Sequence, residues 1–374
     1  MFNGIYRDLN VLVTGHTGFK GSWLCEWLLL LGAKVTGYSL APPTQPALFE
    51  ALGMRARMRD VRGDVRDPAG LVAIIRESKP RLVLHLAAQS LVRTSYSDPT
   101  GTFATNVMGT VNVLEAVRLA GHQCAVVVVT TDKCYENREW LHSYREEDPM
   151  GGFDPYSASK GCAELVTASY RRSFFPPESP VLVASARAGN VLGGGDWALD
   201  RIVPDCIRHL ASGRSIPVRN KHATRPWQHV LEPLSGYLLI GGRLAAQLDF
   251  PPGERVQPPH AACVGAFNFG PSLDSNRPVA DLVQEVLKHW PGSWDDQSSP
   301  TAPHEASLLN LATDKARHLL QWKPVWSFEE TVRQTVSWYR AMDGNRTTSA
   351  GELTRAQIQA YAVAAGERQV AWVR

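Results

Sequence analysis

Residues 10–24, NVLVTGHTGFKGSWL, join a short apolar run to a longer apolar segment through three glycines. Gly15, Gly18 and Gly21 follow the spacing G-x-x-G-x-x-G. A strand, a glycine turn and a helix N-terminus form an anion site, because free backbone amides and the helix dipole point at a phosphate. The glycines also let the chain turn sharply and let a diphosphate approach the backbone. The stretch therefore predicts the first unit of a dinucleotide-binding fold.

Outward from this loop, the first half of the chain alternates apolar strands with helix-length segments. The expected strands are residues 10–14, 34–40, a third ending near Gly63-Asp64, 81–88, 125–132 and 181–193. The expected helices are 21–33, 68–79, 103–121 and 156–174. This alternation predicts an α/β protein with a doubly wound, Rossmann-type parallel sheet.

After Val191 the alternation ends, and Gly and Pro cluster in stretches such as GGGDW and PPGERVQPP. We expect a dinucleotide-binding domain over residues 1–191, with some later segments returning to it. A smaller substrate-binding domain is expected over 192–343, laid over the carboxyl edge of the sheet. Residues 249–263 are expected to form a surface loop. The tail, 344–374, is expected to begin as a linker and to end in a marginal helix.

Composition limits the classes of function. The 374 residues carry a formal charge of only +3, with no basic run of five or more, which argues against a nucleic-acid partner. The apolar run WLCEWLLLLG contains Glu26 and is too short to cross a membrane, and the start of the chain lacks the layout of a signal peptide. Six scattered cysteines without a CxxC pair favour reduced thiols in a cytoplasmic protein. The histidines show no metal-binding spacing, so no metal is expected.

A second motif, YSASK at residues 156–160, indicates proton chemistry. Tyr156 and Lys160 are four residues apart, so they share one face of a helix. The ammonium group of a nearby lysine stabilises a phenolate and lowers its pKa toward the range of a general base. Thr131, at the end of the strand with the sequence VVVV, is expected to complete the set.

These motifs together resemble the extended short-chain dehydrogenase/reductase superfamily. The resemblance rests, in order along the chain, on TGHTGFKG, GDVRD, HLAAQ, Asn106 in NVMGT, TTD and YSASK, and it covers about the first 340 residues. It implies that Thr131 orients a substrate hydroxyl, that Tyr156 is the base and that Lys160 also contacts the nicotinamide ribose. It also implies a homodimer or homotetramer.

The expected cofactor is NAD. The residues expected to bind it are Gly15, His16, Thr17, Gly18, Phe19, Gly21, Ser39, Asp64, Val65, Leu86, Ala87, Ala88, Asn106, Tyr156 and Lys160. The second strand ends in Tyr38-Ser39-Leu40, with neither the acid that usually holds the adenosine ribose nor an arginine for a 2'-phosphate, so this point leaves the cofactor choice open. Asp64 is a partner for the adenine amino group or, equally well, a helix cap or solvated acid.

The residues after Thr131 narrow the reaction. Asp132 and Lys133 stand where nucleotide-sugar 4,6-dehydratases, the group within the superfamily that this chain resembles, usually carry Asp-Glu. Oxidation at carbon 4 of the sugar acidifies the proton on carbon 5, so a base must remove it while an acid protonates the departing hydroxyl on carbon 6. Lys133 is the base if it is neutral, and Asp132 is the acid. The alternative is a plain ion pair at the end of a strand.

The resemblance also implies the substrate, CDP-glucose, and a role in deoxysugar biosynthesis such as that of lipopolysaccharide O-antigen. The residues expected to bind it are Gln89, Ser90, Arg93, Asn190, Arg201, Arg219 and Arg225, with His304 and Glu305 at the rim. Arginine suits bidentate contact with phosphate.

The sequence thus predicts a hydro-lyase. A nucleotide-sugar 4-epimerase or reductase on the same fold, a dehydratase for another nucleotide-glucose and a silent NAD-sensing regulator remain the alternatives.

Overall fold

The computed structural model describes residues 1–176, 178–255, 263–298, 308–344 and 348–374. His304 and Glu305, expected at the rim of the site, lie outside these residues. The strands are β1 (Asn10–Thr14), β2 (Lys34–Ser39), β3 (Arg59–Arg62), β4 (Leu82–His85), β5 (Cys124–Val129), β6 (Val181–Ala188), β7 (Val191–Leu192), β8 (Ile216–Val218), β9 (Thr224–Pro226), β10 (Gln228–His229), β11 (Gly265–Phe269), β12 (Asn276–Pro278) and β13 (Trp294–Asp296). The helices are α1 (Phe19–Leu30), α2 (Leu48–Ala51), α3 (Pro68–Ser78), α4 (Val92–Ser97), α5 (Pro99–Phe103), α6 (Gly109–Ala120), α7 (Pro155–Ser173), α8 (Ile202–Ala211), α9 (Leu231–Gln247), α10 (Pro252–Arg255), α11 (Val279–His289), α12 (Phe328–Gly344) and α13 (Ala350–Glu367).

The central sheet has seven strands in the order β11-β6-β5-β4-β1-β2-β3. Every neighbouring pair in it is parallel. The order reverses between β1 and β4, which confirms the predicted doubly wound sheet and places the crevice for a ligand at the carboxyl ends of these strands.

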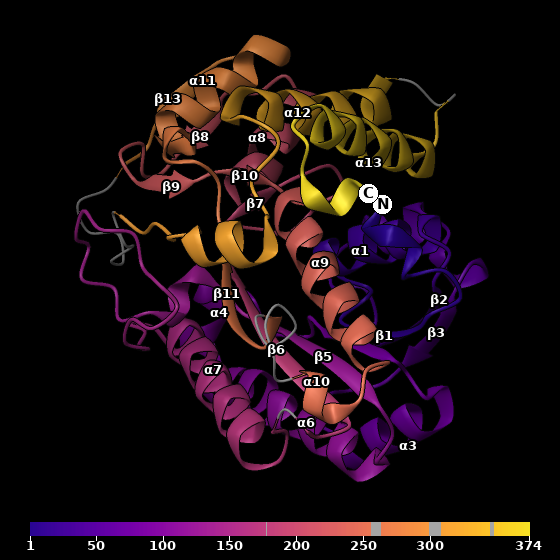
Figure 1. The fold of residues 1–374 in the computed structure, drawn as a ribbon. Coiled ribbons are helices and arrows are strands. Elements are labelled where there is room, and N and C mark those ends of the chain that lie inside the picture. The colour runs from indigo at the N-terminus through magenta and orange to yellow at the C-terminus, as the bar shows by residue number, and fades with distance from the viewer. Residues whose placement is uncertain (177, 256–262, 299–307, 345–347) are drawn as a thin grey trace.

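Helices cover both faces of the sheet. α3, α6 and α7 pack on one face, and α1 and α9 lie on the other (Figure 1). All six residues of β5, CAVVVV, are buried as a result. A continuous run of β-branched residues is what a strand buried on both faces requires.

Side-chain caps fix where the helices of the site begin. Asp154 accepts a hydrogen bond from the amide of Ser157, and Pro155 occupies the first turn of α7. These two residues start the helix directly before the Tyr156 motif. The expected helix over 103–121 is also present, but a π-helical turn, η3 (Ala104–Met108), interrupts it and contains Asn106.

Beyond Val191 most strands have only two or three residues, as expected. β11 is the exception, because its five residues pair with β6 and extend the main sheet. In the segment expected to be a loop, residues 252–255 form the short helix α10.

The tail differs from the expected marginal helix. α13 has 18 residues and begins with a capping box between Ser349 and Glu352. Trp372 stacks on both Phe2 and Tyr361, at ring-centroid distances of 5.3 and 5.6 Å. The amide of Asn3 donates to the carbonyl oxygen of Arg374 at 2.6 Å, so the two ends of the chain lie side by side (Figure 1). Burial of these aromatic rings stabilises a segment whose local sequence looked weak.

Among the described residues, no helix is long and apolar enough to cross a membrane, and no cluster of side chains could hold a metal ion.

Candidate active site

The glycine loop lies between β1 and α1, and close contacts require glycine at two of its three glycine positions. Gly15 has φ of +76°, and a Cβ there would lie 2.7 Å from the amide nitrogen of Ala87. A Cβ on Gly21 would lie 2.2 Å from the carbonyl oxygen of Gly15. Gly18 is different, since a Cβ there would meet only the Gly15 oxygen, at 3.5 Å. Two glycines therefore let the backbone close up, and the third leaves space above it open.

This loop fits a dinucleotide cofactor. Gly18 is the N-cap of α1, and a glycine has no side-chain oxygen with which to cap the first-turn amides. Those amides and the helix dipole face the open space above Gly18, which suits a diphosphate.

At the adenosine end of the loop, hydroxyl groups stand where an acid is usual. The Thr17 hydroxyl lies 3.0 Å from that of Ser39 and donates to the carbonyl oxygen of Leu40 at 3.1 Å. Arg62 of β3 also donates to the Leu40 oxygen, at 2.8 Å. A cation is thus present at this strand end, although it was not evident from residues 38–40 because it comes from the neighbouring strand.

His16 is turned away from the opening of the loop. Its Nε2 lies 2.8 Å from Asp60 Oδ1, and the ring lies where a Cβ on Gly37 would be. Burial lowers the pKa of His16, although the bond to Asp60 acts in the opposite direction. The expected contact of His16 with the cofactor would therefore come from its backbone.

Asp64 is engaged by its neighbour. Arg66 donates to Oδ1 of Asp64 through its amide and to Oδ2 through its guanidinium, the latter at 2.5 and 2.9 Å. These hydrogen bonds lower the pKa of Asp64. Asp64 therefore fits the description of a loop acid bound by its neighbour better than that of a free partner for adenine. Val65, the next residue, is buried.

Asn106 joins the loop after β4 to helix α7. It accepts from the amide of Gln89 at 2.8 Å and donates to both the Gln89 carbonyl and the Ser159 hydroxyl. The Gln89 side chain binds Thr102 and the backbone of Leu91. Both residues thus shape the loop that follows Leu86, Ala87 and Ala88.

The predicted catalytic residues come together at the end of β5. The hydroxyl of Thr131 donates to Asp132 Oδ1 at 3.0 Å, and it also hydrogen-bonds with the hydroxyl of Tyr156. Lys133 follows in the single turn η4 (Asp132–Cys134) and is half-buried. Lys160 Nζ donates to the Val129 carbonyl oxygen at 3.3 Å. Thr131, Asp132 and Lys133 after the strand and the two residues on α7 therefore form one cluster.

The pKa of Tyr156 differs from the expectation. Burial raises it to about 12, although the bond from Thr131 acts in the opposite direction. Burial also lowers the pKa of Lys160 to about 8 and raises that of Asp132. The Lys160 ammonium donates its hydrogen bond to a carbonyl oxygen of β5. The four-residue spacing of Tyr156 and Lys160 therefore does not by itself produce a phenolate.

Two of the predicted substrate arginines reach this cluster from the second part of the chain. Arg201 pairs with Asp196 at 2.7 Å and acts electrostatically on Tyr156. Arg225 lies close enough to Asp132 to oppose the rise in the pKa of that carboxyl.

Two more of the predicted substrate arginines share one carboxylate, that of Asp200. Asp200 pairs with both Arg219, at 2.7 Å, and Arg93, at 3.2 Å, and so links the two parts of the chain. Ser90 is exposed and Asn190 is half-buried.

Comparison with known proteins shows the family of the chain. A family model described as GDP-mannose 4,6 dehydratase matches residues 12–251. The CDP-glucose 4,6-dehydratase of Salmonella typhimurium is 47% identical over 344 residues, which are 90% of this chain and 92% of that protein.

The chain belongs to the GDP-mannose 4,6 dehydratase family.

More distant relatives include other members of this dehydratase family and epimerases. The UDP-glucose 4-epimerase of Mycolicibacterium smegmatis is 26% identical and matches 89% of this chain and 99% of that protein. The dTDP-glucose 4,6-dehydratase DesIV of Streptomyces venezuelae, solved with NAD and TYD bound, superposes with a TM-score of 0.73 at 25% identity. That match covers 89% of this chain and 98% of DesIV.

In this member of the dehydratase family, sequence reasoning missed Lys20. Its Nζ lies 6.0 Å from the ring centroid of Tyr237, and burial together with the charge of Arg201 lowers its pKa to about 8. Asp132 acts on it in the opposite direction. A lysine in the first turn of the helix, directly after the glycine loop, was the signal in the sequence.

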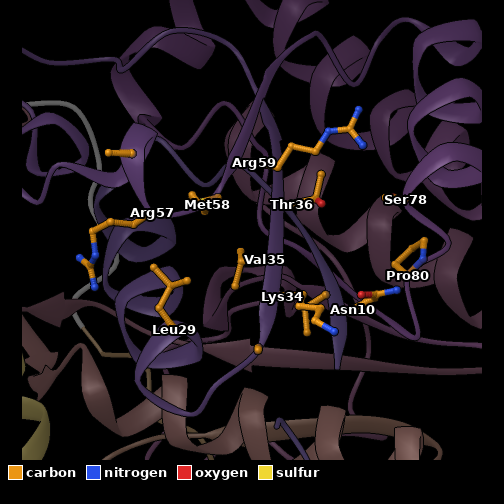
Figure 2. A pocket seen from close by; sticks show the side chains of 13 residues that line it. Asn10, Leu29, Lys34, Val35, Thr36, Arg57, Met58, Arg59, Ser78 and Pro80 are labelled. Atoms are coloured by element: carbon orange, nitrogen blue, oxygen red, sulfur yellow. The ribbon is translucent and has the colours of Figure 1, made fainter. Parts of the chain in front are cut away.

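A cavity of about 490 Å³ lies at the amino ends of the strands, opposite the carboxyl ends (Figure 2). Asn10, Lys34 and Arg59, the first residues of β1, β2 and β3, line it. Lys34 pairs with Asp8, and Arg59 pairs with Glu77. The cavity is therefore remote from the carboxyl ends that carry the catalytic cluster.

Proposed function

We propose that the chain converts CDP-D-glucose to CDP-4-keto-6-deoxy-D-glucose and water with NAD as a recycled cofactor. The observation that carries this proposal is the cluster at the end of β5, where Asp132 and Lys133 follow Thr131 beside Tyr156. An epimerase or reductase needs Thr131, Tyr156 and Lys160 but has no use for an added acid and base. The 47% identity to a protein named CDP-glucose 4,6-dehydratase supports the choice of nucleotide.

The first proton is removed by Tyr156. Its hydroxyl already binds Thr131, so both hydroxyl groups are in place to contact the hydroxyl on carbon 4 of the sugar. A phenol with a pKa of about 12 needs positive charge beside it in order to act as a base near neutral pH. Arg201 already acts on the phenol in this direction, and Lys160, four residues along α7, is the second cation that we propose for this role.

The glycine loop, Ser39 and the loop after β4 would hold NAD, which when bound accepts the hydride from carbon 4 and returns it to carbon 6. The chain contributes the diphosphate site at the start of α1 and a cluster of buried side chains beside which the sugar would lie.

Elimination falls to the strand-end pair. Lys133 removes the proton from carbon 5, and Asp132 protonates the hydroxyl that leaves carbon 6. Burial raises the pKa of Asp132 and so favours the protonated form, which an acid requires. Lys133 then returns a proton to carbon 5.

Residues 192–343 would form the domain that holds the nucleotide. Arg201 and Arg225 lie near the catalytic cluster, while Arg219 and Arg93 meet at Asp200. We propose that these arginines bind the diphosphate and the nucleotide, and that Asn190, Gln89 and Ser90 also contact the substrate.

We also propose a cytoplasmic homodimer or homotetramer that acts in deoxysugar biosynthesis, for example of O-antigen. The six cysteines are unpaired, which suits a reducing compartment. Met108, Leu119, Leu165 and Phe174 expose apolar surface along η3, α6 and α7, where a second copy could pack. Light scattering of the purified protein measures this assembly.

A direct test is incubation with NAD and, separately, with CDP-, dTDP-, UDP- and GDP-glucose. The keto product should form fastest from CDP-glucose, without net accumulation of NADH. Formation of a 4-epimer or of stoichiometric NADH would contradict the dehydratase.

A further inference from the structure

The turn that carries Asp132 and Lys133 is anchored on both sides. Before the turn, the hydroxyl of Thr130 donates to Glu164 Oε1 at 2.5 Å. After it, the hydroxyl of Tyr135 accepts from Arg187 Nη1 at 2.8 Å and donates to Asn268 Oδ1 at 2.7 Å. The two anchors hold positions 130 and 135, with the proposed acid and base between them.

One buried ion pair connects the two anchors. Arg187 Nη2 donates to Glu164 Oε2 at 2.9 Å, and the same oxygen accepts from Ser185 at 2.7 Å. The guanidinium also lies over the ring of Tyr135, 5.0 Å from its centroid. Burial alone would raise the pKa of Glu164, but Arg187 and the two hydroxyl groups leave it below its usual value. The pair is therefore ionised inside the protein.

Four separate segments meet in this cluster. Glu164 belongs to α7, Arg187 and Ser185 to β6, Tyr135 to the loop after η4, and Asn268 to β11. The side chains of Glu164 and Arg187 are 3% and 5% exposed. Because a buried ion pair adds little net stability, its value to the protein is better sought in the geometry that it fixes.

We propose that Glu164, Arg187 and Tyr135 are positioning residues that hold the Asp132–Lys133 turn for the elimination step. This inference rests on the proposed function of that pair. Tyr156 and Lys160 have further contacts of their own, namely the cap of α7 and the bond from Lys160 to Val129, although Glu164 lies on the same helix. Loosening the far end of the turn should therefore affect elimination more than the first hydride transfer.

Tyr135→Phe is the variant of choice. It keeps the ring that Arg187 covers and that stacks on Tyr144 at 5.1 Å, and it removes only the hydroxyl between Arg187 and Asn268. Tyr144→Phe is the matched control, because its hydroxyl binds Asn137 and the amide of Arg138 instead. Thr130→Val tests the other anchor in the same way.

Each variant is mixed with NAD and CDP-glucose, and absorbance of NADH, keto product and solvent deuterium at carbon 5 are followed. Tyr135→Phe and Thr130→Val should form NADH at close to the native rate, accumulate it, and form product about ten- to a hundredfold more slowly, as a small displacement of catalytic groups does. The Michaelis constant should change less than about twofold. Tyr144→Phe should behave like the native protein.

Equal slowing of hydride transfer and elimination, or equal effects of Tyr135→Phe and Tyr144→Phe, would show a general structural role and overturn the inference. Native elimination rates in both anchor variants would overturn it as well. A native protein that forms no keto product from CDP-glucose would instead contradict the proposed function, so the two failures are distinguishable.

Discussion

Lys160 Nζ donates a hydrogen bond to the carbonyl oxygen of Val129 at 3.3 Å, which ties the second residue of the Tyr156–Lys160 pair to the end of β5. The hydroxyl of Tyr156 binds Thr131, two residues further along the chain. One face of α7 therefore contacts the same strand end twice. This arrangement gives the phenol a fixed place from which to remove a proton.

Tyr156→Phe should lower turnover by about a hundredfold or more, because a positioned base contributes roughly that much. The fold and the affinity for NAD should persist, since the glycine loop is untouched. Tyr170→Phe is the control. Tyr170 lies further along α7, and its hydroxyl contacts Glu115 of α6. Turnover and NAD titration check the result, and a near-native rate for Tyr156→Phe would leave that phenol only a structural role.

Arg225→Ala should raise the Michaelis constant for the substrate by about tenfold, since a charged hydrogen bond to phosphate is lost. Turnover should change less than the Michaelis constant, because loss of the Arg225 charge raises the pKa of Asp132 further and so still favours the protonated acid. Arg219→Ala should change the Michaelis constant alone, as Arg219 pairs with Asp200 and does not act on Asp132 or Tyr156.

The exposed Arg172 on α7 supplies the control, Arg172→Ala, for which both constants should stay native. Steady-state kinetics on all three variants checks this prediction. If the Michaelis constant and turnover of Arg225→Ala and Arg219→Ala both stayed native, the two arginines would be excluded from the site.

Stability should depend on pH through Glu232, which links the tail to the rest of the chain. Its carboxylate accepts from the amides of Val325 and Trp326 and from the hydroxyl of Tyr361. Burial raises the pKa of Glu232 to about 7 from 4.5. The folded state thus holds the proton more tightly, so the stabilisation is complete below about pH 4.5 and is lost as the pH rises through 7.

Glu232→Gln should remove this dependence. The difference in free energy of unfolding between native protein and variant should fall by up to roughly 3 kcal/mol between pH 4.5 and 7.5. Urea titrations at a series of pH values measure it. A difference that is constant with pH would show that Glu232 does not change its protonation on unfolding.

The local parts of this structure were predictable from the sequence. The glycine spacing placed the loop between β1 and α1, and the four-residue spacing of Tyr156 and Lys160 placed both near Thr131. These features depend on the periods of strand and helix, which adjacent residues reveal.

Contacts between distant segments were not predictable in the same way. Arg62 reaches the end of β2 from β3, and Lys20 approaches Asp132 from the first turn of α1. The pair of Arg187 with Glu164 joins β6 to α7. No local pattern encodes such pairs, because they depend on the order of strands in the sheet and on the packing of helices across it.

The strand-end pair permits a test that separates oxidation from elimination. Asp132→Asn combined with Lys133→Met keeps the size of both side chains while removing the acid and the base. Thr131 and Tyr156 remain, so hydride should still pass from the substrate to NAD. Absorbance of NADH should therefore appear once per site and then stop.

Deuterium from the solvent should not enter carbon 5 in this double variant, because no group is left to remove the proton there. The hydrogen bond that the Thr131 hydroxyl donates to Asp132 can persist in the variant, because the amide oxygen of Asn also accepts. Dehydration at close to the native rate would mean that Asp132 and Lys133 form only an ion pair at the end of β5. Loss of the first hydride transfer would locate the damage at Tyr156, whose hydroxyl shares Thr131 with the altered pair.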